Sequence, residues 1–575
     1  MPLTGEAERA RASGPGVLER TLATTFAPGT NRRGEVLGAA WTLLLPALEL
    51  REVVCLGVPG PRTLATLARR ASRVTVLSAG RGERRRARRL IARAGLANVE
   101  VVAAADAAGI AAVDLALVAG RSGARYAERL AALPAQGWSL FADVGRGGGR
   151  DAALVAALRA RGRPPALLWL AVAGGEVELA AGLDDEATIA VLRRPPAAVG
   201  GGGPGRRVRA LARRARPGGR TTERCGALLA AGEAPRGAGI APPAYVRAIA
   251  AAATTPVDGC RVGLMAPSDY PSRKAVMLLF PGEADEPRWV VKLTRDAAFN
   301  DRLENEWRAL TVLAGAGIGD GATVPRPAFL GHHAGLAVLG ETALHGVAFR
   351  RRTTGDADCP FARAATDWLL ALGAATVARR ATTTEVAGAL RRLLARFAEL
   401  YRVTDAEHAL LADQVEALAA GAHALPLVMQ HGDPGTWNVL VTPDGRPAFL
   451  DWEAAERHGM PLWDLFYFAR SFGVTVARAA GTRSSLTAFA EQYLADSPLS
   501  RRLAADVERH CADIGLDRGL VGPLFHLCWV HRALKEAMRL PPGELERGRY
   551  IRLLRLCIDR RDAPALRRLF GGGPA

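Results

Sequence analysis

A chain of 575 residues is longer than one ordinary hydrophobic core requires, so we expect two or more domains. Its composition, with 49% hydrophobic and 23% charged residues, excludes a disordered or fibrous protein. The formal net charge of +19 comes from 73 arginines and three lysines (Lys274, Lys292 and Lys535), which indicates a bias of the whole chain and not one basic patch.

The charge, the cysteines and the N-terminus each exclude a class of function. A positive chain attracts polyanions without specificity, and the sequence shows no interleaved aromatic and basic stacking pattern, so we do not expect a nucleic-acid partner. Seven scattered cysteines without a Cys-x-x-Cys pair argue against a zinc site or a disulfide framework. The first residues do not resemble a signal peptide, and the apolar run 36–50 is too short to span a bilayer. We expect a cytoplasmic protein.

The first part of the chain alternates short apolar segments with Ala/Leu/Arg-rich helical segments. Such alternation predicts a doubly wound, Rossmann-like parallel sheet, which we assign to a domain of residues 1–195. The predicted strands are 53–56, 74–77, 99–102, 115–118 and 139–142, with helices at 63–70, 83–94, 123–133 and 152–161 and closing strands at 167–171 and 188–192.

This order of elements resembles the class I S-adenosylmethionine-dependent methyltransferase fold, but the ligand signature of that family is degenerate here. The first turn, 56–61, contains two prolines and no carboxylate, and Ser78 stands where the ribose-binding acid is expected. Asp106 fits an adenine-side position. Three interpretations remain open: a methyltransferase, a domain for another ligand, and a structural or docking module. We favour the last and do not expect S-adenosylmethionine as a cofactor.

Residues 196–241 are rich in glycine, proline and arginine, which predicts a linker. The basic segment 206–216 could form a cationic helix that lies on an anionic membrane. A solvated helix is the favoured interpretation in a chain so rich in arginine.

From residue 242 the pattern changes to a second domain. A helix is predicted at 245–253, strands at 261–265, 275–280 and 289–293, and a helix around Glu306. The segments 324–327, 336–339 and 341–346 are expected to form further strands and a hinge. Residues 361–422 and 472–570 are predicted to be helical.

The stretch 430–453 brings together three groups that can act on one substrate. Apolar runs at 439–441 and 447–450 flank Pro-Asp-Gly-Arg, which predicts a tight hairpin that returns Asp451 close to Asn438. An amide oxygen and a carboxylate at one place suit Mg²⁺. Asp433, on the preceding loop, is free to orient a hydroxyl group and accept its proton.

The run His-Gly-Asp-Pro-Gly-Thr-Trp-Asn (431–438), followed by Leu-Asp-Trp-Glu (450–453), resembles the catalytic core of aminoglycoside phosphotransferase and choline-kinase-like small-molecule kinases. The resemblance covers residues 245–570. It implies a bilobal protein-kinase-like fold, with an N-terminal lobe at 242–345 and a helical C-terminal lobe at 346–575. It also implies ATP and Mg²⁺ as cofactors and the hydroxyl group of a small molecule as phosphate acceptor.

The resemblance also assigns residues to the nucleotide. Lys292 would contact the α- and β-phosphates, where a compact ammonium is better suited than a guanidinium, and Glu306 would fix its direction. The loop over the phosphates is not rich in glycine, so Ser268 and Ser272 would supply contacts.

Further roles follow from the same resemblance. Backbone groups at Glu341 to Ala343 would bind the adenine edge. Asp464 would tie the loops together through backbone hydrogen bonds, and His431 would be an internal hydrogen-bonding residue. The segments 525–529 and 550–556, with His531, are candidates for a substrate wall, although a Trp/Phe/Leu stripe more often forms core.

Two other functions remain open from the sequence. One is a pseudokinase or nucleotide-binding scaffold, which the glycine-poor phosphate loop allows. The other is a bifunctional enzyme that methylates and phosphorylates one natural product or glycan. No motif in the sequence selects the acceptor.

Overall fold

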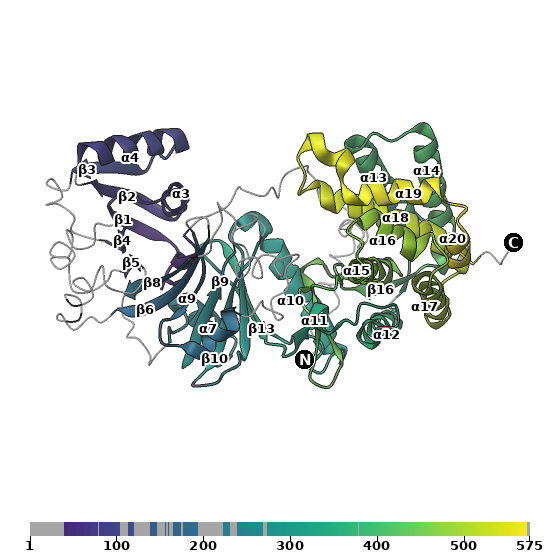
Figure 1. Ribbon diagram of the computed structural model, residues 1–575, viewed down its shortest axis with the longest axis horizontal. Helices are drawn as coiled ribbons and strands as arrows, with labels where there is room; N and C mark the ends of the chain where they lie inside the picture. Colours follow the sequence, from purple (N-terminus) through teal and green to yellow (C-terminus); the bar gives the residue numbers. More distant parts are fainter. Residues whose placement is uncertain are drawn as a thin grey trace, which may run out of the picture. The chain divides into compact units, whose positions relative to one another are not determined.

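The computed structural model describes residues 39–78, 80–103, 113–119, 139–145, 156, 159, 165–173, 176–193, 222–229, 239–267, 273–377 and 379–571 (Figure 1). The chain divides into two compact units. The first, the sheet unit, contains Arg33–Trp307 and Pro325–Ala343. The second, the helical unit, contains Arg308–Val324 and Leu344–Ala575.

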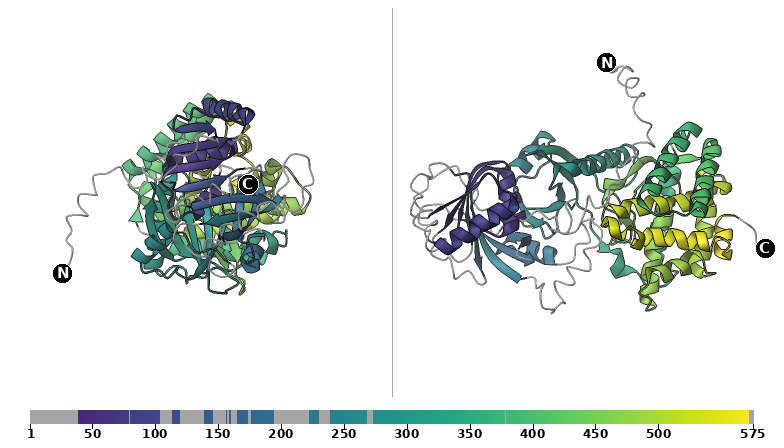
Figure 2. Two further views of the ribbon diagram at one scale, coloured as in Figure 1. Left: turned by 90° about the vertical axis from the view of Figure 1, so that its left-hand side faces the viewer. Right: turned by 90° about the horizontal axis from the view of Figure 1, so that it is seen from above.

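The N-terminal part of the sheet unit is a parallel sheet. Its strands are β1 (Leu50–Leu56), β2 (Ala71–Ser78), β3 (Val99–Ala103), β4 (Leu115–Val118) and β5 (Ser139–Gly145), in the spatial order β3-β2-β1-β4-β5. All four neighbouring pairs in this order are parallel, as predicted. Helices α3 (Pro61–Arg70) and α4 (Arg81–Ala94) lie against this part of the sheet (Figure 2).

The closing strands differ from the prediction. Strand β6 (Ala166–Ala173) forms as expected, but β8 (Thr222–Leu229) lies between β5 and β6, antiparallel to both. This strand falls inside the segment predicted as linker, so the linker prediction is wrong for residues 222–229. The sequence gives little signal for β8, because Glu223 and Arg224 are exposed and, where burial is described, the buried residues are Gly226, Ala227 and Leu228.

Residues 188–192, predicted as a strand, form part of helix α7 (Glu186–Arg193). The Asp185 carboxylate accepts the Thr188 N–H at 3.1 Å, which caps the first turn of the helix. Thr188, Ile189 and Leu192 are buried at helical spacing. The short β-branched run resembles a strand, but the acidic residues before it are a helix-start signal.

The sheet continues without a break into the second predicted domain. Strand β7 (Glu176–Gly182) pairs with β6 and with β9 (Cys260–Met265), and the order continues as β9-β10-β11-β13-β12. These antiparallel strands are β10 (Ala275–Pro281), β11 (Trp289–Leu293), β12 (Pro327–His333) and β13 (Leu336–Thr342). Helix α9 (Ala244–Ala252) precedes β9, and helix α10 (Asn300–Gly315) lies between β11 and β12 in the chain. They are the parts expected of a kinase-like N-terminal lobe.

One hydrophobic cluster crosses the predicted domain boundary at residue 242. Trp169 and Ile189 pack in the same cluster as Phe280 and Ala343. A buried ion pair between Arg261 on β9 and Asp185 before α7 also joins the two parts, and the Arg261 Nε donates to the Gly282 carbonyl at 2.7 Å. Both predicted parts are therefore packed into one unit.

The helical unit contains small sheets and a bundle of helices around α18 (Val521–Ala537), whose Trp529 is fully buried (Figure 1). Among the described helices, none has the length and apolar character needed to cross a bilayer. The strands form two sheets, β14 (Val347–Ala348), β17 (Val439–Val441) and β18 (Pro447–Phe449), and β15 (Arg379–Arg380), β16 (Pro426–Gln430) and β19 (Glu456–Gly459). The other helices are α11 (Phe349–Arg352), α12 (Pro360–Ala375), α13 (Thr383–Leu400), α14 (Asp405–Ala420), α15 (Trp463–Ala479), α16 (Ser485–Tyr493), α17 (Pro498–Ile514), α19 (Arg549–Asp559) and α20 (Pro564–Leu569).

The junction inside the sheet unit can be tested through Asp185. Asp185→Ala removes the cap of α7 and leaves the Arg261 guanidinium buried without its carboxylate, so we expect the free energy of unfolding to fall by about 3 kcal/mol. Urea denaturation would measure it. The control is Asp184→Ala at the exposed neighbouring position, which should change stability by less than about 0.5 kcal/mol. Equal effects of the two substitutions would contradict the role given to Asp185.

Candidate active site

The first group of candidate residues is a buried ion-pair cluster in the sheet unit. Lys292 on β11 projects its Nζ to within 2.7 Å of Glu306 Oε1 on α10 and 2.7 Å of Glu341 Oε1 on β13. The other Glu306 oxygen, Oε2, lies 3.4 Å from Lys274 Nζ. Lys292, Glu306 and Glu341 are each at most 1% exposed. Charges so deeply buried are held only when they are paired, and here two lysines and two glutamates share the contacts.

The contact between Lys292 and Glu306 is the one that the sequence predicted, whereas the Glu341 carboxylate is an addition. Residues 292 and 339 are directly paired in the β11–β13 ladder, so Glu341 is a diagonal neighbour of Lys292 on the same face of the sheet. Burial raises the pKa of Glu341 to about 7, while Lys292 opposes the shift and Glu306 adds to it. Lys292 thus lies between two carboxylates that repel each other.

The other predicted nucleotide contacts are less fully defined. Ser268 and Ser272 lie outside the described residues. The Glu341 backbone is within β13, paired with Val290 and Pro327, and the Ala343 N–H donates to the Arg288 carbonyl at 2.9 Å. The adenine-edge role of these backbone groups stays a prediction.

The second group lies in the helical unit and is built on the predicted hairpin. Strands β17 and β18 pair in the register Val439 with Phe449, and the Leu450 N–H donates to the Asn438 carbonyl at 2.9 Å. Asn438 and Asp451 therefore stand next to the same end of the hairpin. Asp451 has a left-handed backbone with φ of 69°, a conformation that costs free energy in a residue other than glycine and is often found at functional sites.

The loop from Asp433 to Asn438 is closed by its own hydrogen bonds. The Asn438 side-chain amide donates from Nδ2 to the Asp433 carbonyl at 2.9 Å and to the Asp433 Oδ2 at 3.3 Å. Asn438 is fully buried, whereas the Asp433 side chain is 31% exposed. Asp433 thus keeps a fixed carboxylate that a molecule from solvent can reach.

Two residues hold this loop from behind, as the sequence predicted. The Asp464 carboxylate accepts the His431 N–H at 2.6 Å and the Gly432 N–H at 3.0 Å. His431 Nδ1 accepts the Asp433 N–H at 3.2 Å, so its Nε2 carries the proton that is donated to the Leu450 carbonyl at 2.9 Å. Gly432 has φ of 76°, and a Cβ there would lie 1.8 Å from the Ala454 carbonyl oxygen, so only glycine fits.

Arg532 on α18 is a site residue that the sequence analysis missed. Its guanidinium lies 3.7 Å from the Asp433 Oδ1, donates to the Gly432 carbonyl at 2.9 Å, and stacks 3.5 Å from the centre of the Tyr467 ring. Lys535 lies one turn later on the same helix, near Glu456. Lysine is rare in the chain, and two of its three lysines, Lys274 and Lys292, contact the Glu306 carboxylate.

The predicted Mg²⁺ ligands can be tested against one observation. Both hydrogen bonds of the Asn438 side chain are donated by its Nδ2. Its Oδ1 is buried and has no hydrogen-bond partner among the described residues. An unpaired buried amide oxygen beside a carboxylate fits a hard cation. No cluster of three His, Cys, Asp or Glu side chains suited to a metal occurs in the described part of the chain, so substrate oxygens and water would complete the shell.

The substrate-wall candidates are core residues. Phe525 and Trp529 are fully buried in the main cluster of the helical unit, and His531 stacks on Trp463 with ring centres 4.9 Å apart. In the sheet unit, the Ser78 hydroxyl lies 3.3 Å from the Glu83 carboxylate, and Asp106 lies outside the described residues.

Comparison with known proteins supports the kinase resemblance. Residues 280–505 match the sequence model of the Phosphotransferase enzyme family, so the predicted resemblance is confirmed for that segment. No curated protein matches the chain.

Solved structures with similarity include two kinds of enzyme. An aminoglycoside phosphotransferase of Streptomyces rimosus, solved with ADP and streptomycin, is 20% identical over 46% of this chain and 90% of its own, with a TM-score of 0.29. A thermostable mutant of another aminoglycoside phosphotransferase, solved with ADP and hygromycin B, is 14% identical over 54% and 95%, with a TM-score of 0.33. Precorrin 8W decarboxylase of Methanobacterium thermoautotrophicum is 17% identical over 34% and 94%, with a TM-score of 0.23. All three TM-scores are below 0.5, so we infer nothing about this chain from these structures.

The carboxylate pair around Lys292 predicts a pH-dependent stability. A glutamate has an ordinary pKa of 4.5, and Glu341 has a pKa of about 7 in the folded chain. The folded state therefore holds this proton more tightly, and the stability gained from it is lost as the pH rises from 4.5 to 7. Glu341→Gln cannot titrate, so its melting temperature relative to the wild type should rise between pH 5 and pH 8.

Calorimetric melting of both proteins across this pH range would measure the difference. The exposed Glu283→Gln is the matched control and should follow the wild type at every pH. Parallel pH dependences of Glu341→Gln and the wild type would contradict the buried, competing carboxylate.

Proposed function

We propose that the protein is an ATP- and Mg²⁺-dependent phosphotransferase that phosphorylates a hydroxyl group of a small molecule, of the aminoglycoside, sugar or amino-alcohol kind. The observation that carries the proposal is the loop from Asp433 to Asn438. It fixes a reachable carboxylate beside a buried amide oxygen that has no partner among the described residues. The family match over residues 280–505 agrees with this chemistry.

The lysine cluster supplies charge for the nucleotide. Lys292 would contact phosphate oxygens of ATP, and Glu306 holds its Nζ at 2.7 Å. A buried ammonium held in place needs no reorganisation when a phosphate arrives, which is the general source of electrostatic stabilisation. Glu341 shares the same ammonium, so phosphate oxygens would have to compete with its carboxylate.

Asp433 would act on the acceptor. Its carboxylate accepts a hydrogen bond from the acceptor hydroxyl and orients the oxygen toward the γ-phosphorus. A new bond forms between the acceptor oxygen and phosphorus, the bond to the β–γ bridging oxygen breaks, and ADP leaves. The hydroxyl proton passes to Asp433 late in the transfer.

Asn438 Oδ1 and the Asp451 carboxylate would hold Mg²⁺. When bound, Mg²⁺ neutralises charge on the phosphate oxygens. Asn438 keeps its oxygen available because its Nδ2 is committed to Asp433, so the same side chain connects the metal position to the catalytic carboxylate.

Arg532 would position Asp433. The guanidinium is 7% exposed, stacked on Tyr467 and bonded to the Gly432 carbonyl, so its location is fixed by three contacts with the helical unit. A cation 3.7 Å away keeps the Asp433 carboxylate oriented.

The test of the proposal is Mg²⁺-dependent ADP release from ATP in the presence of pooled small hydroxyl compounds. Release should require a member of the pool, and Asp433→Asn should lower it by at least about 100-fold, because the variant cannot accept the proton. The exposed Asp413→Asn on α14 is the control and should keep full activity.

Two other outcomes of this assay would contradict parts of the proposal. Equal release by Asp433→Asn and the wild type would contradict the assigned catalytic residue. No release with any pool member, although MgADP raises the melting temperature, would favour a nucleotide-binding scaffold.

Arg532→Met should lower kcat by about tenfold while the KM for ATP changes little, because the guanidinium contacts the Asp433 loop and not the lysine cluster. Steady-state kinetics with varied ATP would separate the two parameters. Arg539→Met, at an exposed position after the same helix, is the matched control. A raised KM for ATP with unchanged kcat would contradict the positioning role.

A further inference from the structure

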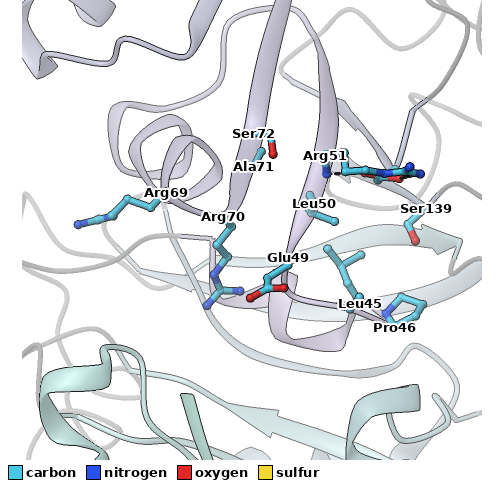
Figure 3. Close-up of a pocket in the computed structure, with 12 residues that line it drawn as sticks. Leu45, Pro46, Glu49, Leu50, Arg51, Arg69, Arg70, Ala71, Ser72 and Ser139 are labelled. Carbon is cyan, nitrogen blue, oxygen red and sulfur yellow. Dashed lines mark hydrogen bonds and ion pairs between the residues drawn. The ribbon is translucent and has the colours of Figure 1, made fainter. Parts of the chain in front are cut away.

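A cavity of about 670 Å³ lies in the N-terminal part of the sheet unit, at the edge where its strands begin (Figure 3). Leu50, Ala71 and Ser139 are the first residues of β1, β2 and β5, and all three line the cavity. Ligands of open α/β sheets bind beyond the carboxyl ends of the strands. The cavity is at the opposite edge, so it is not the position that a methyl donor would take.

Arg70, the last residue of α3, supplies an unbalanced charge to this cavity. Its Nη1 donates to the Thr42 Oγ1 at 2.6 Å, which is the one side-chain hydrogen bond that Arg70 makes among the described residues. No described carboxylate lies within 4.0 Å of its guanidinium. Burial lowers the pKa of Arg70 to about 10, and the adjacent Arg69 adds to the shift. A partly buried guanidinium that forms no ion pair with a described carboxylate favours the binding of an anion.

Two other charged residues that line the cavity, Glu49 and Arg51, differ in their hydrogen bonds and ion pairs. Glu49, which lines the cavity and is drawn near Arg70 in Figure 3, makes no hydrogen bond or ion pair with any described residue. Arg51, in contrast, faces Asp114 at 3.5 Å. The cavity therefore presents the Arg70 guanidinium, whose one side-chain partner among the described residues is Thr42, and the exposed Glu49 carboxylate. The cavity is also lined by the exposed Arg69, the Ser139 side chain and an apolar wall of Leu45 and Pro46.

The walls of the cavity are fixed by contacts that need no ligand. The Leu48 N–H donates to His333 Nε2 at 3.1 Å, and the Tyr245 hydroxyl donates to the Leu43 carbonyl at 2.7 Å. The rings of Tyr245 and His333 stack with centres 4.6 Å apart. The Asp114 carboxylate accepts the backbone N–H of Glu52 at 3.1 Å. A preformed cavity loses little conformational entropy when a ligand binds.

We propose that this cavity binds a small organic oxyanion that also carries a hydroxyl or amino group. The phosphate or carboxylate group of the ligand would pair with the Arg70 guanidinium, which suits the planar geometry of either anion. The hydrogen-bond donor of the ligand would bind the Glu49 carboxylate. The N-terminal part of the chain would thereby be a ligand-binding module, with a site distinct from the lysine cluster and from the Asp433 loop.

Calorimetric titration of the full chain with inorganic phosphate, glycerol 3-phosphate and serine, each at up to about 10 mM, tests the proposal. Phosphate and glycerol 3-phosphate report phosphate recognition, and serine reports carboxylate recognition. MgADP is kept saturating so that the proposed nucleotide site is occupied. Arg70→Met should weaken binding of the active probe by at least about tenfold, whereas Arg62→Met, exposed on the first turn of α3, should not.

Glu49→Gln gives a second readout that does not depend on loss of structure. Removing the carboxylate should strengthen inorganic phosphate binding by about threefold, because one repulsive charge is gone, and should weaken the probes that carry a hydrogen-bond donor. The proposal is overturned if the wild type binds none of the three probes. It is also overturned if Arg70→Met and Arg62→Met behave alike, or if Lys292→Met abolishes the binding and Arg70→Met leaves it unchanged.

Discussion

A buried ammonium group is the constraint on which much of the sheet unit depends. Lys292 is only 1% exposed, so the strands and helix around it must bring carboxylates to its Nζ. Glu306 comes from α10, which follows β11 in the chain, and Glu341 comes from β13, which pairs with β11 in the sheet. Lys274 then shares Glu306. The cluster ties these elements together, and in the proposed function the same ammonium would contact a phosphate.

In the helical unit, hydrogen bonds to backbone groups hold the loop that carries Asp433. The loop that carries Asp433 must turn sharply and still leave a carboxylate reachable. Gly432 takes a conformation and a contact that no side chain permits, and Asp464 accepts two successive N–H groups of the turn. Arg532 holds the loop through the Gly432 carbonyl. In the proposed function, the sheet unit would supply fixed positive charge and the helical unit a positioned carboxylate.

The elements that the sequence predicted correctly have short-range signals. Strands β1–β5 are apolar runs, with α3 and α4 described between the first three of them, and the β17–β18 hairpin has Asp-Gly in its turn. The errors have physical causes of longer range. Strand β8 is identified only by its partners β5 and β6, since half of it is polar and exposed, and α7 is identified by its cap and not by its β-branched residues.

The candidate site shows the same division. The spacing of Asp433, Asn438 and Asp451 lies within one stretch of sequence, so it could be predicted, and so could the pair of Lys292 and Glu306. Arg532 comes to the Asp433 loop from a helix about 100 residues later, and the Glu341 carboxylate depends on a diagonal contact across two strands. Neither contact has a local signal. The continuous sheet from β3 to β12 likewise depends on the single pairing of β7 with β9, which no motif encodes.

The measurement that tests the central claim most directly is the affinity of ADP for the full chain, with Mg²⁺ and with EDTA, in the wild type and in Asn438→Ala. If the unpaired Asn438 oxygen holds the metal, Mg²⁺ should tighten ADP binding to the wild type by at least about tenfold, and the substitution should remove most of that gain. Affinity without the metal should change little. ADP binding that does not respond to Mg²⁺, or responds equally in the variant, would contradict the proposed metal site and the phosphotransferase built on it.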